Sequence, residues 1–251
     1  MFATKTLFEK TLLHHLLQEF QVRYRFKYVL PKIHEIVLEG LKFDVSGLST
    51  KIRNRLLSGA YESHEKEMCC DYLSPNDSVL EIGGAIGFIG LLCQKKLGIK
   101  NYACFEANPK TYEILKRNYE LNGVTPCVWN MALAHADGHV DLEVGSDFWE
   151  NSICYDNASK NGVKTVRVPA GTLDTLLGMV GHKVNTLIID IEGAEQFIDF
   201  QRIPEEISKI IIELHPGVMG QEVMYNIVAT LIGLGFRVAR EENDTFVFLR
   251  K

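Results

Sequence analysis

The sequence has no C-x-x-C pair, and this absence removes the usual signature of a zinc or redox site. Scattered free thiols are typical of a reducing compartment, so we expect a cytoplasmic protein. The first residues show no long apolar segment and no small-residue cleavage site, so no secretory signal is expected. Apolar runs fall well short of about 18 residues, and we expect no transmembrane helix. The six cysteines are Cys69, Cys70, Cys93, Cys104, Cys127 and Cys154.

An excess of positive charge is also lacking. The formal net charge is −5, whereas nucleic-acid-binding proteins usually carry a basic balance or stripe. One stretch, residues 21–32, does mix basic and aromatic side chains and could touch nucleic acid or a membrane surface. We favour a helix whose aromatic face packs on the protein and whose charges face water, and we expect no nucleic-acid partner.

The 251 residues, 46% of them hydrophobic, suffice for one large domain with an N-terminal extension. We expect a helical extension over 1–34, a region over 35–74 with a hairpin at 35–45 and a helix at 60–73, and the main domain over 75–251. From Ser78 onward, strands that are apolar on both faces alternate with helices. This rhythm predicts an α/β fold with a doubly wound, mostly parallel sheet, extended by an antiparallel hairpin near residues 236–250.

The sequence Val79-Leu80-Glu81-Ile82-Gly83-Gly84-Ala85-Ile86-Gly87 predicts a strand, a glycine-rich loop and the start of a helix over 86–97. Such loops let a ligand approach the backbone closely and direct N–H groups toward it. The full G-x-G-x-x-G pattern of dinucleotide sites is absent. Glu81 would repel a pyrophosphate, but it would suit a cofactor that carries ammonium and sulfonium charges. The alternative is a tight turn that binds nothing.

Acidic residues also follow three later strands. Glu106 ends the second strand, where a carboxylate can accept hydrogen bonds from both ribose hydroxyls. Asp190 and Glu192 end the fourth main strand and point to the same side, toward the crevice where open α/β sheets bind ligands. The alternative is a strand exit whose acids only cap a helix.

Glu213 and His215 end the next strand, again on one face. A histidine at such a rim can act as a general base, since its free pKa is about 6.5; the alternative is a structural histidine with satisfied hydrogen bonds. Together with Asp190 and Glu192 these side chains could hold a divalent cation. We do not expect a metal, because the sequence does not show that the four converge.

In their order and spacing, seven segments resemble the FkbM family of S-adenosylmethionine-dependent methyltransferases. The resemblance covers about residues 35–250 and leaves out residues 1–30. Two positions depart from the common pattern: Glu81 stands where Asp is more frequent, and Ile86 where many members have Asn. The segments are GAYE (59–62), VLEIGGAIGF (79–88), CFEANP (104–109), NMALAHADGHV (130–140), VPAGTLDTLL (168–177), LIIDIEGAEQFI (187–198) and IIIELHP (210–216).

The resemblance implies the seven-stranded class I methyltransferase fold, which is Rossmann-like, with S-adenosylmethionine as cofactor and S-adenosylhomocysteine as product. It usually implies O-methylation of a sugar, glycan or polyketide-like hydroxyl. It assigns the methionine part of the cofactor to the glycine loop, the ribose to the end of the second strand, the adenine to the exit of the third, and a closing role to a Tyr-Glu pair. The residues are Glu81, Gly83, Ala85 and Gly87 for the methionine part; Glu106, Ala107 and Asn108 for the ribose; Asn130, Met131 and Ala132 for the adenine; and Tyr61 and Glu62 for the closing pair. Asp190, in the D-x-E-G-x-E block, is also expected at the cofactor.

Our hypothesis for the chemistry places Asp190, Glu192 and His215 around the acceptor, with His215 or Glu192 as the base. We expect the acceptor pocket in the loop over 145–162, with Trp149, Asn151, Ser152 and Tyr155. The N-terminal helix could pack on its own domain or on a partner. Two other functions stay open: a non-catalytic scaffold that binds the cofactor or nothing, and a nicotinamide oxidoreductase, against which the broken glycine pattern and Glu81 count.

Overall fold

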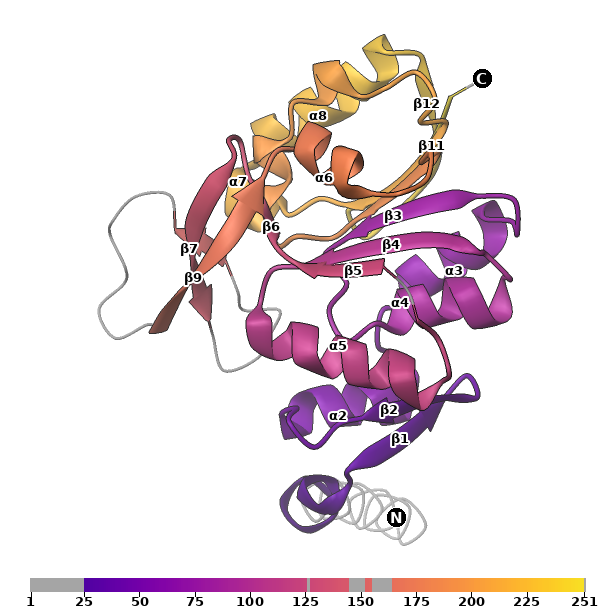
Figure 1. Ribbon diagram of the computed structural model, residues 1–251, viewed down its shortest axis with the longest axis vertical. Helices are drawn as coiled ribbons and strands as arrows, with labels where there is room; N and C mark the ends of the chain where they lie inside the picture. The colour runs from indigo at the N-terminus through magenta and orange to yellow at the C-terminus, as the bar shows by residue number, and fades with distance from the viewer. Residues whose placement is uncertain (1–24, 126, 145–151, 155–163, 251) are drawn as a thin grey trace, which may run out of the picture. The chain divides into compact units, whose positions relative to one another are not determined.

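The computed structural model describes residues 25–125, 127–144, 152–154 and 164–250 (Figure 1). The chain divides into two compact units, Met1–Tyr61 and Glu62–Lys251. Most of the helical extension predicted over 1–34 and most of the loop over 145–162 lie outside the described residues, as do Trp149, Asn151 and Tyr155. Within the described ranges, no helix is long and apolar enough to cross a membrane.

The first unit contains the predicted hairpin, which the structure confirms as β1 (Glu35–Leu38) paired antiparallel with β2 (Leu41–Asp44). It is preceded by the short helices η1 (Arg25–Val29) and η2 (Leu30–Lys32). Helix α2 (Thr50–Ser58) was not predicted. Its ends are nevertheless well marked, because the Ser49 hydroxyl accepts the N–H of Ile52 and Gly59 ends the helix with a φ of 72°.

Arg53 of α2 is buried and organises this first unit. Its guanidinium donates hydrogen bonds to four backbone carbonyls, those of Leu30, Ile33, Ser46 and Leu48, at 2.8–3.0 Å. Arginine offers five N–H donors in a fixed plane, so a single side chain can join η2, the end of the hairpin and the start of α2.

The second unit is built on a seven-stranded sheet with the order β12-β13-β11-β10-β3-β4-β5. The five strands from β11 to β5 are parallel, and the hairpin of β12 and β13 is antiparallel, as predicted. The chain leaves β3 toward β4 on one side and later returns to β10 on the other, which puts a topological switch point between β3 and β10. The strands are β3 (Ser78–Ile82), β4 (Asn101–Glu106), β5 (Cys127–Asn130), β10 (Thr186–Ile189), β11 (Lys209–Glu213), β12 (Phe236–Glu242) and β13 (Thr245–Arg250).

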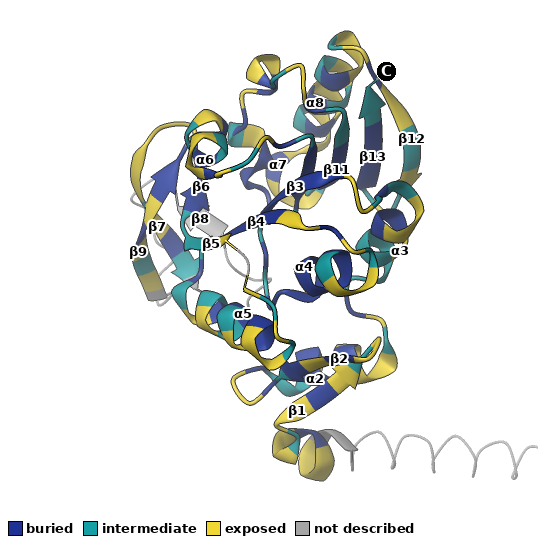
Figure 2. Cartoon of the chain, turned by 45° about the vertical axis from the view of Figure 1, so that its right-hand side comes forward, coloured by how far each residue is buried: buried dark blue, intermediate teal, exposed yellow. Residues whose placement is uncertain are grey.

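Helices cover both faces of this sheet, and its central strands are largely buried (Figures 1 and 2). On one face lie α3 (Ser63–Tyr72), α4 (Phe88–Leu91) and α5 (Pro109–Leu121), and on the other α6 (Leu173–Met179) and α8 (Gln221–Gly233). The short elements η5 (Ala194–Phe197), η6 (Phe200–Arg202) and α7 (Pro216–Met219) follow β10 and β11. The core on the α6 and α8 side contains alternate residues of five strands, such as Leu80, Phe105 and Ile189.

The structure differs from the sequence expectations in two places. The helix predicted over 86–97 begins at Phe88 and is interrupted, because α4 passes into the π-helix η3 (Leu92–Lys96). A second, four-stranded sheet with the order β6-β9-β7-β8 was also not foreseen. It consists of β6 (Ala132–Leu133), β7 (Gly138–Val144), β8 (Ser152–Cys154) and β9 (Lys164–Gly171).

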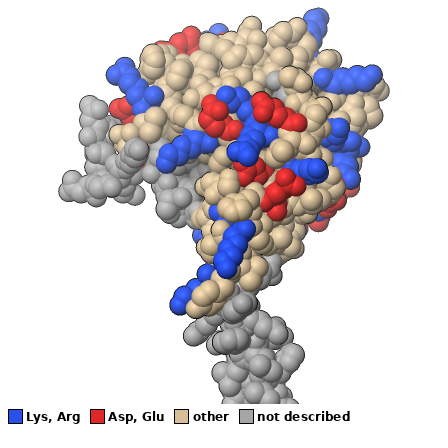
Figure 3. Space-filling view, turned by 60° about the horizontal axis from the view of Figure 1, so that its bottom comes forward, with Lys and Arg blue, Asp and Glu red and all other residues tan. Residues whose placement is uncertain are grey.

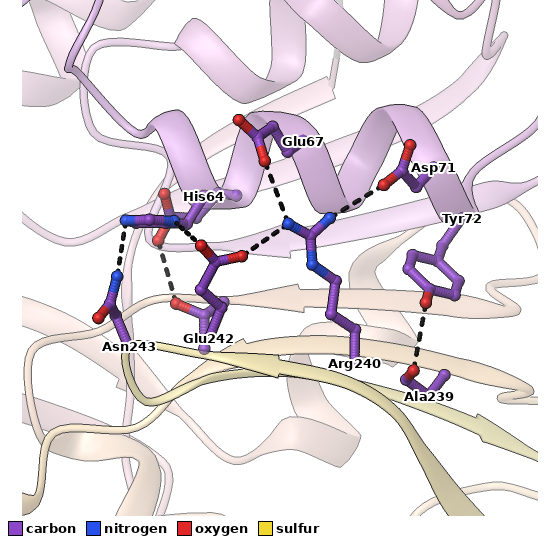
Figure 4. A network of polar contacts seen from close by, with 10 residues as sticks. His64, Glu67, Asp71, Tyr72, Ala239, Arg240, Glu242 and Asn243 are labelled. Carbon is purple, nitrogen blue, oxygen red and sulfur yellow. Dashed lines mark hydrogen bonds and ion pairs between the residues drawn. The ribbon is translucent and has the colours of Figure 1, made fainter.

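Helix α3 is joined to the C-terminal hairpin by polar contacts centred on Arg240 of β12 (Figure 4). Its guanidinium lies 2.9 Å from Asp71, 3.1 Å from Glu67 and 2.6 Å from Glu242. His64 contacts the other oxygen of Glu242 at 3.3 Å. These contacts hold α3 along one face of the sheet. Several carboxylates project from that same face.

The face drawn in Figure 3 mixes both signs of charge, with Lys and Arg side chains interspersed among Asp and Glu. Such a surface lacks the continuous basic stripe that phosphate backbones attract.

Candidate functional site

Acidic side chains gather on one face of the sheet at the carboxyl ends of its central strands. Glu81 pairs in register with Cys104 of β4 and Ile188 of β10, and Ile188 pairs with Ile211 of β11. Because side chains alternate along a strand, Glu81, Glu106, Asp190 and Glu213 all project from the face that α3 and α4 cover. Four neighbouring strands therefore deliver carboxylates to the switch point, where open α/β sheets bind ligands.

The glycines after β3 are required by tight packing at this point. Gly83 has a φ of 96°, and a Cβ on it would lie 1.7 Å from the backbone oxygen of Asp190. A Cβ on Gly84 would lie 2.2 Å from the sulfur of Cys104. Gly87, with a φ of 83°, starts α4, and Ala85 has a φ of 44° although it is not glycine. The glycine loop thus brings the end of β3 directly against the end of β10.

Glu106 connects this loop to the end of β4. One carboxylate oxygen accepts the N–H of Ala85 at 2.9 Å, and the other accepts the N–H of Asn108 at 2.7 Å. Burial raises the pKa of Glu106 to about 7, although the two hydrogen bonds act in the opposite direction. Each oxygen keeps a further lone pair, so the carboxylate can still accept hydrogen bonds from two ligand hydroxyls.

Glu81 lies below the loop and is buried. Burial raises its pKa to about 7, against the lowering effect of the neighbouring Cys104 thiol and Tyr102 hydroxyl. Within the described part of the chain, its Oε2 has no hydrogen-bond partner. A buried carboxylate oxygen without a donor is costly, and a ligand that brings a cationic donor to the glycine loop would relieve that cost.

Asn130 ends β5, and together with Met131 and Ala132 it holds the ends of two strands together. The Asn130 amide donates to the carbonyls of Glu106 and Ala107 at 2.9 and 2.8 Å, and the N–H of Met131 donates to Glu106. Ala132 is buried in β6. Both amide hydrogens of Asn130 are therefore occupied, and only its oxygen is left for a ligand. Asn108 caps α5 by accepting the N–H of Lys110 at 3.0 Å.

Tyr61 and Glu62 stand at the boundary of the two units. Tyr61 is the last residue of the first unit and is buried. Glu62 opens the second unit with a φ of 44° and precedes α3. That this pair closes over a cofactor stays a prediction.

His215 is the centre of the second group of residues, which we call the acid cluster: Asp190, Glu192, Glu195 and Glu213 around His215. The Nδ1 atom of His215 lies 3.0 Å from Glu195 Oε1. Its Nε2 atom lies 3.6 Å from Asp190, 3.5 Å from Glu192 and 3.8 Å from Glu213. The convergence that the sequence could not show is therefore present in the structure.

The pKa values in the acid cluster are displaced by burial and by mutual charge. Burial raises the pKa of Asp190 to about 7 and that of Glu192 to about 8, and His215 partly opposes both shifts. Burial and the charge of Asp190 raise the pKa of Glu213 to about 9. Burial alone would lower the pKa of His215, but its hydrogen bond to Glu195 and the surrounding carboxylates raise it to about 10. The resting imidazole thus holds its proton at neutral pH.

Glu195 received no role from the sequence, although it is the third acid of the D-x-E-G-x-E block. It is fully buried, and its Oε1 accepts the N–H of Ile191 at 3.1 Å as well as contacting His215. Glu195 thereby fixes both the backbone between Asp190 and Glu192 and the orientation of the imidazole. The signal in the sequence was its position as the last acid of that block, two residues after Gly193.

Comparison with known proteins gives one family and several distant likenesses. The family model for the methyltransferase FkbM domain matches residues 81–238. The protein Methyltransferase 1 of Beauveria bassiana (strain ARSEF 2860) is 27% identical over 164 residues, covering 56% of this chain and 66% of that protein. The match thus spans just under two thirds of that relative.

Two solved structures illustrate the structural likenesses. M. capricolum TrmK in complex with S-adenosyl-homocysteine has 10% identity and a TM-score of 0.43 over 74% of this chain and 66% of that chain. M. jannaschii TYW2 in complex with AdoMet has 13% identity and a TM-score of 0.43 over 88% of each chain. Likenesses of this degree say nothing about an acceptor.

Proposed function

Because the chain belongs to the methyltransferase FkbM domain family, we propose that it transfers a methyl group from S-adenosylmethionine to a hydroxyl oxygen of a sugar, glycan or polyketide-like small molecule. One arrangement carries this proposal. The glycine loop and the acid cluster meet at the switch point, where Gly83 lies against the backbone carbonyl of Asp190. A ligand on the loop and an acceptor beside the cluster would be neighbours.

The residues at the loop fit this cofactor. Glu106 would accept the ribose hydroxyls with its remaining lone pairs, and the unpartnered oxygen of Glu81 would face the cationic methionine end. Gly83, Ala85 and Gly87 would line that end. Asn130, Met131 and Ala132 would border the adenine, and Tyr61 and Glu62 would close the site. When bound, S-adenosylmethionine supplies a methyl group on a positively charged sulfur that an oxygen can attack.

Within the acid cluster we assign the base to Glu192. Its φ of 53° places a non-glycine residue in the left-handed region, a strain often found at functional sites. In the described part of the chain its carboxylate has one ion-pair partner, His215, at 3.5 Å. His215 keeps its own proton, whereas Glu192, whose pKa is raised to about 8, can take the proton of an acceptor hydroxyl held against Asp190 once it is ionised.

The first test is cofactor binding by calorimetry with S-adenosylmethionine, S-adenosylhomocysteine and NAD. We expect micromolar binding of the two adenosyl ligands and none of NAD. Glu106→Ala should lose that binding, while Glu205→Ala, which removes an exposed carboxylate, should keep it. Binding of NAD alone would replace the proposal with an oxidoreductase, and binding of none of the three would favour a scaffold.

The second test concerns turnover. Glu192→Gln keeps the shape of the side chain and removes its ability to take a proton. With an acceptor found by screening hydroxyl compounds for S-adenosylhomocysteine release, we expect kcat to fall by about 10²–10⁴-fold, with cofactor affinity unchanged. A Glu192→Gln enzyme that turns over at the wild-type rate would show that another group takes the proton.

A further inference from the structure

We propose that the acid cluster is a binding site for a divalent transition-metal ion, with His215 Nε2, Asp190 and Glu213 as ligands and Glu195 as the carboxylate that orients the imidazole. The catalytic meaning of this site rests on the proposed function, since the ion would lie beside the acceptor. Metal binding itself can be measured with neither cofactor nor acceptor present.

The orientation of His215 favours a ligand role for Nε2. Its Nδ1–H is directed at Glu195 Oε1, 3.0 Å away, and Glu195 is in turn fixed by the N–H of Ile191. Histidines that bind metals almost always donate their other ring N–H to a carboxylate or carbonyl in this way. The buried pair therefore leaves Nε2 as the ring nitrogen that faces the remaining acids, and a metal ion that binds there displaces the proton that the imidazole otherwise holds.

The distances around Nε2 also suit a cation better than hydrogen bonds. Asp190 and Glu213 lie 3.6 and 3.8 Å from Nε2, beyond the roughly 3.2 Å at which an N–H···O bond is effective. Two ligands each about 2.1 Å from a tetrahedral ion are about 3.4 Å apart, so a small closure would bring these atoms to coordination distance. Nε2 and each of the two carboxylates are thus spaced nearly as far apart as two ligands of one ion.

The register of the sheet brings the two carboxylate ligands together. Ile189 of β10 pairs with Ile212 of β11, so Asp190 and Glu213 follow side by side and point to the same face. Like charges in adjacent positions repel each other. Among the described residues, neither carboxylate forms an ion pair with a lysine or arginine, and His215 is their one cationic partner.

Unpartnered buried oxygens supply independent support. Glu195 is fully buried, and its Oε2 has no hydrogen-bond partner in the described part of the chain; the same holds for Asp190 Oδ1. Asp190, Glu195 and His215 each have one possible ligand atom, and these three atoms lie within 4.8 Å of one another. Leaving Asp190 Oδ1 without a donor is costly, and because this atom lies 3.6 Å from His215 Nε2, a cation bound between the two would remove that cost.

The donor set indicates the class of ion. An imidazole nitrogen with carboxylates suits Mn²⁺, Fe²⁺ or Zn²⁺, whereas Ca²⁺ and Mg²⁺ prefer oxygen ligands alone. Glu192, 3.5 Å from Nε2, would stand next to the ion. A hydroxyl placed there would become more acidic through the positive charge and could pass its proton to Glu192.

The experiment titrates the chelator-treated full chain with Mn²⁺ by calorimetry and follows the bound ion by electron paramagnetic resonance. We expect one ion per chain, with a nitrogen coupling from His215 in the pulsed spectrum. His215→Gln and Asp190→Asn should weaken binding at least about 100-fold, and Glu195→Gln by about 10–100-fold. The matched control Glu205→Gln, at an exposed carboxylate, should bind as the wild type does.

Absence of Mn²⁺ binding, or binding that His215→Gln and Asp190→Asn leave unchanged, would overturn the metal site. If those variants do not fold by circular dichroism, the wild-type spectrum decides, because a bound ion without nitrogen coupling contradicts a histidine ligand. Cofactor binding to the chelated protein is measured in parallel. A protein that binds the cofactor but not Mn²⁺ rejects only the metal site. A protein that binds Mn²⁺ but not the cofactor rejects only the proposed function.

Discussion

Glu106 shows how a single buried carboxylate can be prepared for a ligand. Two backbone N–H groups hold its oxygens, yet burial keeps its pKa near 7. The side chain is therefore partly protonated at neutral pH in the free protein. A ligand that donates two hydroxyl hydrogens favours the ionised form and should expel the proton on binding.

Cofactor affinity should consequently rise with pH. Below the pKa of about 7, protonated Glu106 loses acceptor capacity, and above it the carboxylate is fully available. We expect Glu106 to contribute a fall in S-adenosylhomocysteine affinity of up to about tenfold per pH unit below pH 7. The measurement is calorimetry between pH 5.5 and 8.5, in buffers of matched ionic strength.

Glu106→Gln provides the control, because it keeps the shape and removes the titration. Glu81, whose pKa is also raised to about 7, and the ligand's own amino group continue to titrate in this variant. The two profiles should differ by the one proton of Glu106. Parallel profiles for wild type and Glu106→Gln would mean that this carboxylate does not accept the hydroxyls.

At the scale of elements, the junction of β3 and β10 determines where the two groups of site residues meet. The loop after β3 can touch the end of β10 only because Gly83 has no side chain. The glycine that sequence patterns associate with a ligand is thus required first by the contact of two strands. The same contact places Asp190 next to the loop.

Gly83→Ala should therefore damage the fold as well as the site. Its Cβ would meet the backbone oxygen of Asp190 at 1.7 Å, and alanine disfavours a φ of 96°. We expect a loss of about 3–5 kcal/mol in the free energy of unfolding, measured by urea denaturation. The control is Gly178→Ala in α6, where a Cβ meets nothing within 4 Å and should be neutral or stabilise by up to about 1 kcal/mol. If Gly83→Ala is as stable as the wild type, Gly83 does not pack tightly against the backbone of Asp190.

Most of the main sheet could be predicted from the sequence, because buried parallel strands are continuous apolar runs such as residues 187–189. Helix α2 was missed because it is short and rich in charge, and its only strong signals are the caps at Ser49 and Gly59. The second sheet was missed because its pairings join segments far apart in the sequence, as with Ala132 and Ala170. Local sequence patterns do not predict such strand pairings.

The candidate site was predictable in part for a similar reason. Strand-end acids such as Glu106 and Asp190 are visible as polar residues after apolar runs. The burial of Glu195 and its bond to His215 depend on the path of η5 relative to the strand ends. No local sequence pattern predicts that path. The raised pKa of His215 likewise depends on Asp190, Glu192 and Glu195, which lie 20 or more residues before it in the chain.

At the scale of the whole molecule, the sheet collects its acidic site residues from β4, β3, β10 and β11, and Asn130 ends β5 beside them. The acid cluster lies on β10 and β11 and the segments that follow them, and β11 is held on its outer side by β13. The positions of Glu213 and His215 therefore depend on a strand that carries no site residue of its own.

Strand β13 lies between β12 and β11, although it follows β12 in the chain. A ribosome therefore releases β12 while its neighbour is still unmade, and the edge of β11 stays open until residues 245–250 emerge. Open strand edges are the places where nascent chains pair wrongly with one another. A chain that ended just before residue 245 would thus keep β12 without a neighbouring strand and leave the outer edge of β11 unpaired.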